Sequence, residues 1–228
     1  MDETLFTSID NYCERTGPEI WSEPLNAITN LAFVVAGIAG HVLCRRHGAD
    51  RFAVFLCWWA IVIGVGSGLF HTFANGITLY ADVLPIVAFI LLINWYVVTR
   101  FLDIDAIPAL AILAAFYLIA GALAGLAPES LRAATNGTIG YLPALLGLLF
   151  FGGWLSMHGH PAARYMFWAA GVFVVSAFFR SVDMAMCAAL PIGTHFLWHT
   201  LNGLVLGVLL AGAAKFGGKR GAVQAFGR

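Results

Sequence analysis

The chain has 228 residues, of which 61% are hydrophobic and only 11% are charged, and its formal net charge at pH 7 is zero. Water-soluble domains carry about 25% charged residues, so this composition argues against a soluble enzyme. The balanced charge and the lack of low-complexity tracts argue equally against a disordered or nucleic-acid-binding chain. We therefore expect a polytopic membrane protein, with residues 1–228 forming one domain.

The first 25 residues form an acidic segment. Six of the twelve acidic residues fall in it, against a single base, Arg15. A secretory signal peptide has the opposite pattern, a positive start followed directly by an apolar stretch. We expect residues 1–25 to be retained as an acidic cap before the first membrane span.

Seven long apolar runs follow this cap. Each approaches the roughly 20 residues that a helix needs to cross a bilayer core of about 30 Å. The runs are continuously apolar, which favours helices over the alternating strands of a membrane barrel. They cover residues 26–44, 51–72, 78–99, 107–126, 138–157, 163–182 and 195–214. The predicted fold is an all-α, seven-transmembrane-helix bundle over 26–214, with a tail at 215–228.

Lysine and arginine predict the orientation, because basic residues are retained on the cytoplasmic side. With the N-terminus outside, nine of the twelve basic residues fall inside, and only Arg15, Arg132 and Arg180 fall outside. We expect an outer N-terminus and a cytoplasmic C-terminus. The low lysine content and abundant alanine and glycine indicate a bacterial source, so the membrane would be the inner membrane, with the periplasm outside.

Polar side chains gather at the outer ends of three spans, where their cost in a membrane marks a functional site. They are Ser67, His71, Asp82, His195 and His199. Residues four apart share a helix face, so Ser67 points with His71, and His195 with His199. Two histidines at this spacing commonly bind one metal ion. Three histidines with an open fourth position are typical of a catalytic zinc site.

Other polar residues at the outer level have less certain roles. Asn26, Thr29 and Asn30 in the first span are either hydrogen-bond donors around the site or ordinary helix-packing groups. Arg180 and Asp183 are three residues apart on one helix, and we expect them to form a local ion pair.

The four cysteines contain no Cys-x-x-Cys pair. Cys44 and Cys57 fall toward the inside, where we expect reduced thiols. Cys13 and Cys187 both fall outside, where an oxidising compartment permits a disulfide. We predict that bond.

Three other functions fit a seven-span chain. A retinal pigment needs a buried lysine, and the only lysines, Lys215 and Lys219, fall at or beyond the inner end of the last span. A haem-binding electron carrier using His71 with His195 or His199 would show a Soret band. A receptor-like lipid-binding protein would keep the zinc only for structure. We expect zinc, with neither retinal nor haem; nothing in the sequence indicates an oligomeric state.

The same residues resemble the alkaline ceramidases and their bacterial relatives, within the seven-helix membrane hydrolases that include the adiponectin receptors. The matching segments are YCERTGPEIWSEPLNAITN (12–30), GVGSGLFH (64–71), LYADVLP (79–85) and HFLWH (195–199). The Cys-Glu and Glu-x-x-Asn elements before the first span point to the ceramidase branch.

The resemblance implies a catalytic centre. In it, His71, His195 and His199 would bind zinc, Asp82 would hold the attacking water, and Ser67 would lie beside the reacting carbonyl. Ser67 then donates to the developing oxyanion, and Asp82 works as acid and base. The implied activity is hydrolysis of ceramide or a related N-acyl lipid from the bilayer, releasing a fatty acid and a sphingoid-type base.

The resemblance also implies a calcium site in the acidic cap. Glu14 and Glu23 match two of its ligands, and Thr16 stands where the family often has asparagine. An aspartate is expected just upstream of the Cys-Glu pair, where this chain has Asp10 followed by Asn11. Such oxygen ligands are the kind that calcium prefers.

Overall fold

The computed structural model describes residues 3–217, and the regular structure in this range is helical, with one isolated bridge between Ser8 and Asn75. Seven helical segments of this range are long and apolar enough to cross a membrane, which confirms the predicted all-α, seven-span architecture. They are α1 (Pro24–Thr29) with α2 (Leu31–His47), α3 (Arg51–Phe73), α4 (Gly76–Tyr96) with η2 (Val97–Phe101), α5 (Ala106–Gly125), η3 (Thr138–Tyr141) with α7 (Leu142–Met157), α8 (Ala163–Met186) and α9 (His195–Phe216).

Two short helices lie outside these spans: η1 (Glu3–Phe6) in the cap and α6 (Glu129–Ala134) between α5 and η3. The span boundaries agree with the predicted ones to within a few residues. The predicted tail falls largely outside the described residues: Lys215 and Phe216 end α9, and residues 218–228 are not described. The orientation across the membrane stays a prediction.

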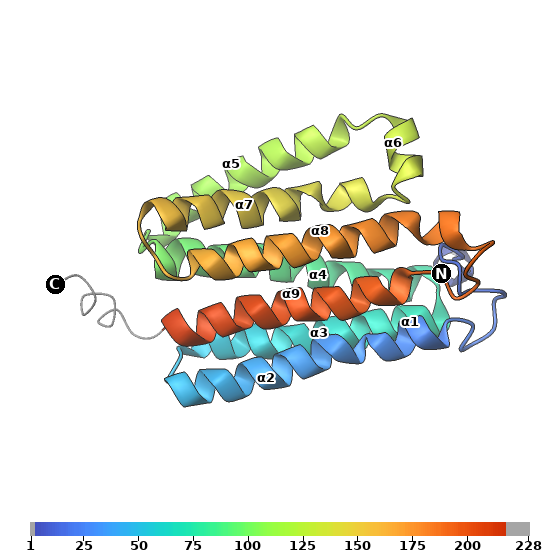
Figure 1. Cartoon of the computed structure of the whole chain (residues 1–228), viewed down its shortest axis with the longest axis horizontal. Helices are drawn as coiled ribbons and strands as arrows, with labels where there is room; N and C mark the ends of the chain where they lie inside the picture. The colour runs from blue at the N-terminus through green and yellow to red at the C-terminus, as the bar shows by residue number, and fades with distance from the viewer. Residues whose placement is uncertain (1–2, 218–228) are drawn as a thin grey trace.

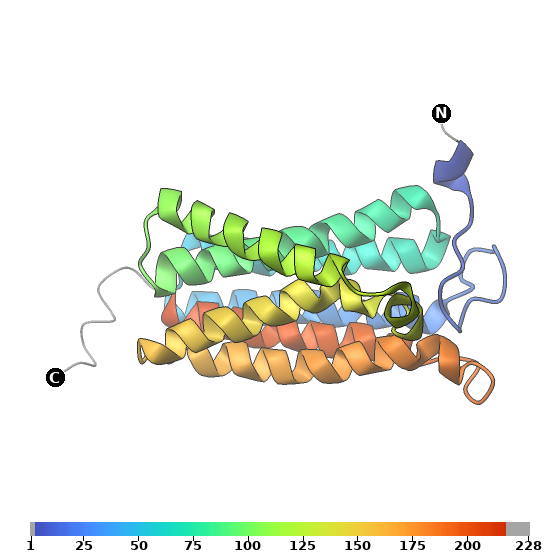
Figure 2. The same cartoon turned by 90° about the horizontal axis from the view of Figure 1, so that it is seen from above.

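The long helices run side by side along one axis, with α9 placed between α2 and α8 (Figure 1). Helix α9 packs most extensively against these two helices and also touches α1 and α3. In both views, the cap lies at the same end of the bundle as the connection from α8 to α9 (Figure 2). The N-terminal end of α9, which bears His195 and His199, therefore meets the cap.

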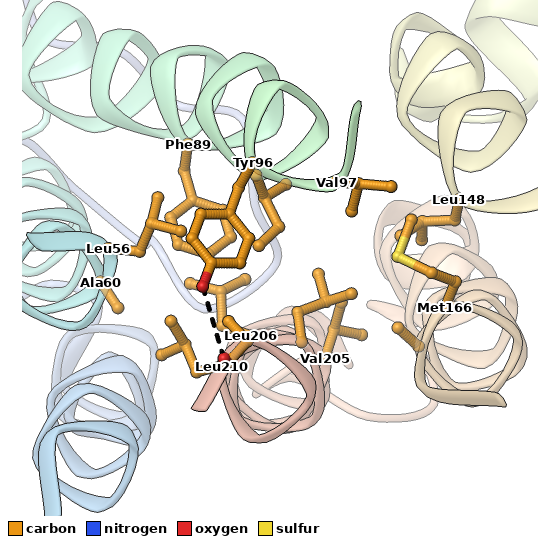
Figure 3. Packing of buried hydrophobic residues seen from close by; sticks show 14 of the residues in the cluster. Leu56, Ala60, Phe89, Tyr96, Val97, Leu148, Met166, Val205, Leu206 and Leu210 are labelled. Atoms are coloured by element: carbon orange, nitrogen blue, oxygen red, sulfur yellow. Dashed lines mark hydrogen bonds between the residues drawn. The ribbon is translucent and has the colours of Figure 1, made fainter. Parts of the chain in front are cut away.

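The core is formed by large apolar side chains from α3, α4, α7, α8 and α9 (Figure 3). Leu56, Phe89 and Leu210 are almost fully buried there. The Tyr96 hydroxyl donates to the carbonyl oxygen of Ala213 across 3.5 Å and so links α4 to α9. Helix α4 packs closely on α3 but touches α7 only lightly. The outer surface carries many exposed apolar side chains, as expected for a surface that faces lipid.

The turn between α3 and α4 brings His71 and Asp82 to one end of the bundle. Ala74 ends α3 in a left-handed conformation (φ 41°), and Asn75 begins α4. The Asn75 side chain accepts from the backbone N–H of Thr78, while the Thr78 hydroxyl accepts from the backbone N–H of Asn75. This reciprocal cap satisfies N–H groups that a helix start leaves unpaired. The tight reversal explains why two residues on successive helices share one level of the membrane.

Candidate metal centre and active site

His71, His195 and His199 converge at the cap end of the bundle. All three side chains are buried, and one nitrogen from each lies within 4.8 Å of the others. His71 lies in the last turn of α3, and the other two occupy the first two turns of α9. This group of donors is compatible with a metal ion such as zinc.

Hydrogen bonds from neighbouring elements orient two of the three rings. Nδ1 of His71 lies 2.6 Å from a carboxylate oxygen of Glu23. Nδ1 of His199 lies 3.2 Å from the Thr29 hydroxyl, whose own proton is donated to the carbonyl oxygen of Leu25. Both Nδ1 atoms therefore carry the proton and donate it. In each ring, Nε2 is therefore the nitrogen left to bind a metal.

The third ring, His195, offers a buried Nδ1 that has no hydrogen-bond partner. Buried polar atoms are nearly always paired, because an unpaired one loses its hydration without compensation. An unpaired nitrogen beside two oriented imidazoles is what a metal site requires. The donor set thus fits the ion that the sequence predicts.

The polar residues at the start of the first span have three different roles. Thr29 contacts a member of the histidine cluster directly, as described above. Asn26 contacts the cluster indirectly, because its side-chain N–H donates to the Glu23 oxygen that accepts from His71. Asn30 donates only within its own helical segment, to the carbonyl oxygen of Asn26. The sequence left these roles open, since spacing does not show which faces meet.

Ser67 and Asp82 lie together beside the histidine cluster. Ser67 is buried, and its hydroxyl interacts with the Asp82 carboxylate, which also lies within the electrostatic reach of His71. Gly66 makes this approach possible: a Cβ there would overlap the carbonyl oxygen of Ala81 on α4. One oxygen of Asp82, Oδ1, is buried without a hydrogen-bond partner. The hydroxyl proton of Ser67 is thus directed at Asp82, and the pair offers an unengaged carboxylate oxygen to a bound molecule.

Tyr12 and Arg180 complete the site, although no pattern in the sequence indicated either role. The Tyr12 ring stacks on His195 at a centroid distance of 3.7 Å, and its hydroxyl accepts from Arg180 at 2.8 Å. Burial raises the pKa of Tyr12, and the guanidinium of Arg180 opposes that shift. Tyr12 belongs to the cap, so this segment covers the histidines from the end of the bundle.

The expected ion pair between Arg180 and Asp183 is wrong. Arg180 instead lies among the rings of Tyr12, Tyr141 and Trp198. Asp183 is fully buried and turns to the start of α9. Its Oδ1 accepts from the backbone N–H groups of Thr194 (2.6 Å) and His195 (2.9 Å). A helix start leaves backbone N–H groups unpaired, and those at the start of α9, with that of Cys13, occupy the Asp183 carboxylate.

A disulfide joins Cys13 in the cap to Cys187 just after α8, with their Cα atoms 5.3 Å apart. The backbone N–H of Cys13 also donates to Asp183. The cap is therefore fastened to the carboxylate that starts α9 and positions His195. Cys44 and Cys57 are buried free thiols.

The residues predicted to bind calcium do not fit that ion in this structure. Both oxygens of Glu14 accept backbone N–H groups at the start of α1, from Leu25 and Asn26, at 2.7 Å each. Both oxygens of Glu23 accept from side chains, which are those of Arg15, Asn26 and His71. Asp10, Asn11 and Thr16 are exposed. A cation needs lone pairs that point at it, and every oxygen of these two carboxylates already accepts at least one N–H group.

An apolar cavity of about 70 Å³ begins one helical turn below the site. Ile63 lies four residues before Ser67, and Ile86 four residues after Asp82; both line it. It continues along α9 from Trp198 to Leu209, a length of about 16 Å at 1.5 Å per residue. A second hollow on the outer side of α4 shares four of its lining residues, which are Ile86, Ile90, Tyr141 and Ala144. The cavity thus adjoins the lipid-facing surface between α4 and the start of α7.

The fold and the site together define a multi-pass membrane protein with a buried three-histidine centre above an apolar cavity. A sequence model of the family described as Ceramidase matches residues 5–214. The chain belongs to the Ceramidase family, which confirms the resemblance and supports an amidohydrolase that acts on ceramide. A comparison with curated proteins found no match.

Proposed function

We propose that this protein is a zinc-dependent intramembrane hydrolase. It would cleave the amide bond of ceramide or a related N-acyl lipid into a fatty acid and a sphingoid-type base. The observation that supports this most strongly is the convergence of His71, His195 and His199 within 4.8 Å, beside Ser67 and Asp82. We further propose that the site lies near the periplasmic face of a bacterial inner membrane; the distribution of basic residues supports the side, and the lysine, alanine and glycine content supports the source.

The three imidazoles would hold the ion as neutral ligands, which the Nδ1 partners of His71 and His199 favour. When bound, zinc supplies Lewis acidity that polarises a carbonyl and lowers the pKa of water to about 7. Among the described residues, this group supplies three candidate donors, all of them histidines. A set of three histidines would leave a position open for water or substrate, as is typical of catalytic rather than structural zinc.

Asp82 would move the protons of the reaction. Its unengaged Oδ1 takes a proton from the water as the water oxygen attacks the amide carbonyl carbon. The same carboxyl then gives that proton to the amide nitrogen as the C–N bond breaks, leaving a carboxylic acid and an amine. When the substrate binds, the Ser67 hydroxyl would turn from Asp82 and donate its hydrogen bond to the carbonyl oxygen, where negative charge develops.

The cavity supports a lipid substrate lying along the bundle. With the amide at the level of Ser67 and Asp82, a hydrocarbon chain would descend between α4, α7 and α9 into the apolar space. The neighbouring hollow on the outside of α4 would let the lipid enter from the bilayer. A hydrolase built inside a membrane thereby receives its substrate without extracting it into water.

The test is zinc content and ceramide hydrolysis measured on the same purified protein. We expect stoichiometric zinc by plasma mass spectrometry, no Soret band, and fatty acid and sphingoid base detected by mass spectrometry. His199→Ala should lose both zinc and product. His158→Ala is the matched control, because His158 is exposed at the opposite end. Zinc at wild-type stoichiometry in His199→Ala would refute the ligand assignment, and zinc without hydrolysis of any N-acyl lipid would refute the enzyme in favour of a receptor-like protein.

A further inference from the structure

The acidic cap encloses a buried arginine. The side chain of Arg15 is 1% exposed, as is that of its partner Glu23. Nε of Arg15 donates to Oε1 of Glu23 at 2.5 Å. Its two terminal nitrogens donate to the carbonyl oxygens of Gly17 (3.0 Å) and His71 (3.4 Å). A cation taken out of water must be paired and hydrogen-bonded, and this one meets a carboxylate and two carbonyls.

Glu23 connects this arginine to the histidine cluster. Its Oε1 receives Arg15, while its Oε2 receives Nδ1 of His71 at 2.6 Å and Asn26 at 3.1 Å. All three of these contacts are N–H donors, which is the environment that a carboxylate requires in a buried position. Arg15 is the permanent cation among them.

We propose that Arg15 is a built-in cation that takes the place of a calcium ion in the cap and positions the zinc ligand His71 through Glu23. A carboxylate and backbone carbonyls are also the groups that calcium uses, and here the guanidinium occupies them. Arg15 holds His71 from two sides, through the Glu23 carboxylate and through the carbonyl oxygen of His71 itself. It is a positioning residue, and the protein needs no calcium for its fold or its zinc site.

This inference rests on the proposed function only where zinc binding is measured. The first test therefore measures neither zinc binding nor hydrolysis. Wild-type protein is dialysed against calcium-free buffer containing zinc, and its calcium content and melting temperature in detergent are measured. We expect no stoichiometric calcium and no change in melting temperature on adding millimolar calcium chloride. One equivalent of retained calcium, or stabilisation by calcium, would overturn the proposal.

The second test removes the cation. Because ligand-orienting partners are worth about 10- to 100-fold in metal affinity, Arg15→Ala should weaken zinc binding by that factor in a chelator competition. Millimolar guanidinium chloride should restore part of the affinity, and Arg15→Lys should lose less because it keeps the charge. Arg132→Ala is the matched control, since Arg132 donates only to backbone carbonyls at the end of α5.

Wild-type zinc affinity in Arg15→Ala would overturn the positioning role. Should Arg15→Ala not fold, Arg15→Lys and the wild-type calcium measurements still decide the question. These readouts stand apart from catalysis. A protein that binds zinc without hydrolysing ceramide would refute the proposed function and leave this inference intact, whereas calcium found in an active wild-type enzyme would do the reverse.

Discussion

Thr29 and His199 are separated by 170 residues in the sequence, yet the Thr29 hydroxyl lies 3.2 Å from Nδ1 of His199. The hydroxyl is already committed as a donor to Leu25, so it accepts the proton of the imidazole. The first span thereby selects which nitrogen of a residue on the last span is free. Glu23 does the same for His71. Two of the three candidate ligands are thus oriented by the segment that joins the cap to the bundle.

Replacing Thr29 by valine should weaken zinc binding without unfolding the protein. Valine keeps the shape but offers no acceptor, so we expect zinc affinity to fall by about 10- to 100-fold. Chelator competition on the purified protein measures the change. Thr200→Val is the control, because Thr200 follows His199 directly and is exposed, with its hydroxyl bonded only to Phe196. Equal affinities in the two variants would contradict the role of Thr29.

Replacing Asp82 by asparagine should separate metal binding from turnover. The side chain keeps its size but can no longer take a proton, so we expect retained zinc and a loss of about 10²- to 10⁴-fold in kcat. Ser67→Ala should cost about 10²- to 10³-fold, as expected for one lost oxyanion donor. Asp105→Asn, on an exposed residue before α5, is the control. Full activity in Asp82→Asn would remove its acid–base role.

Filling the apolar cavity should change the choice of lipid. Ala144 is buried and lines both the cavity and the outer hollow. Ala144→Phe should raise KM for long N-acyl chains more than for short ones, with a stability cost of about 1–3 kcal/mol for overpacking. The comparison is Leu149→Phe on the same helix, where the side chain is exposed to lipid. An unchanged chain-length profile would show that the lipid chain lies elsewhere.

Breaking the bond between Cys13 and Cys187 should loosen the cap from α9. We expect Cys13→Ser with Cys187→Ser to destabilise the protein by about 2–4 kcal/mol, because the cross-link restricts the unfolded chain. The melting temperature of the wild type should fall with a reductant, and that of the double variant should not. Non-reducing peptide mapping that finds both thiols free would rule out the bond.

The sequence by itself predicted the parts of this protein that depend on local physics. A bilayer demands about 20 apolar residues per helix, so the seven spans could be read directly. The four-residue spacing also predicted that His195 would point with His199, since one helical turn brings them to one face. The loss of hydration inside a membrane marked Ser67 and Asp82 as candidates.

Only the tertiary structure decided which groups complete the site, because their contacts join segments far apart in the chain. Arg180 and Asp183 are neighbours on a helix, yet one faces aromatic rings and the other the start of α9. From the sequence, the acidic cap is expected to bind calcium, whereas in the structure Arg15 contacts Glu23. Charge and spacing along a chain do not show which cation contacts a buried carboxylate. The packing of the folded chain determines it, because only one partner fits beside the carboxylate.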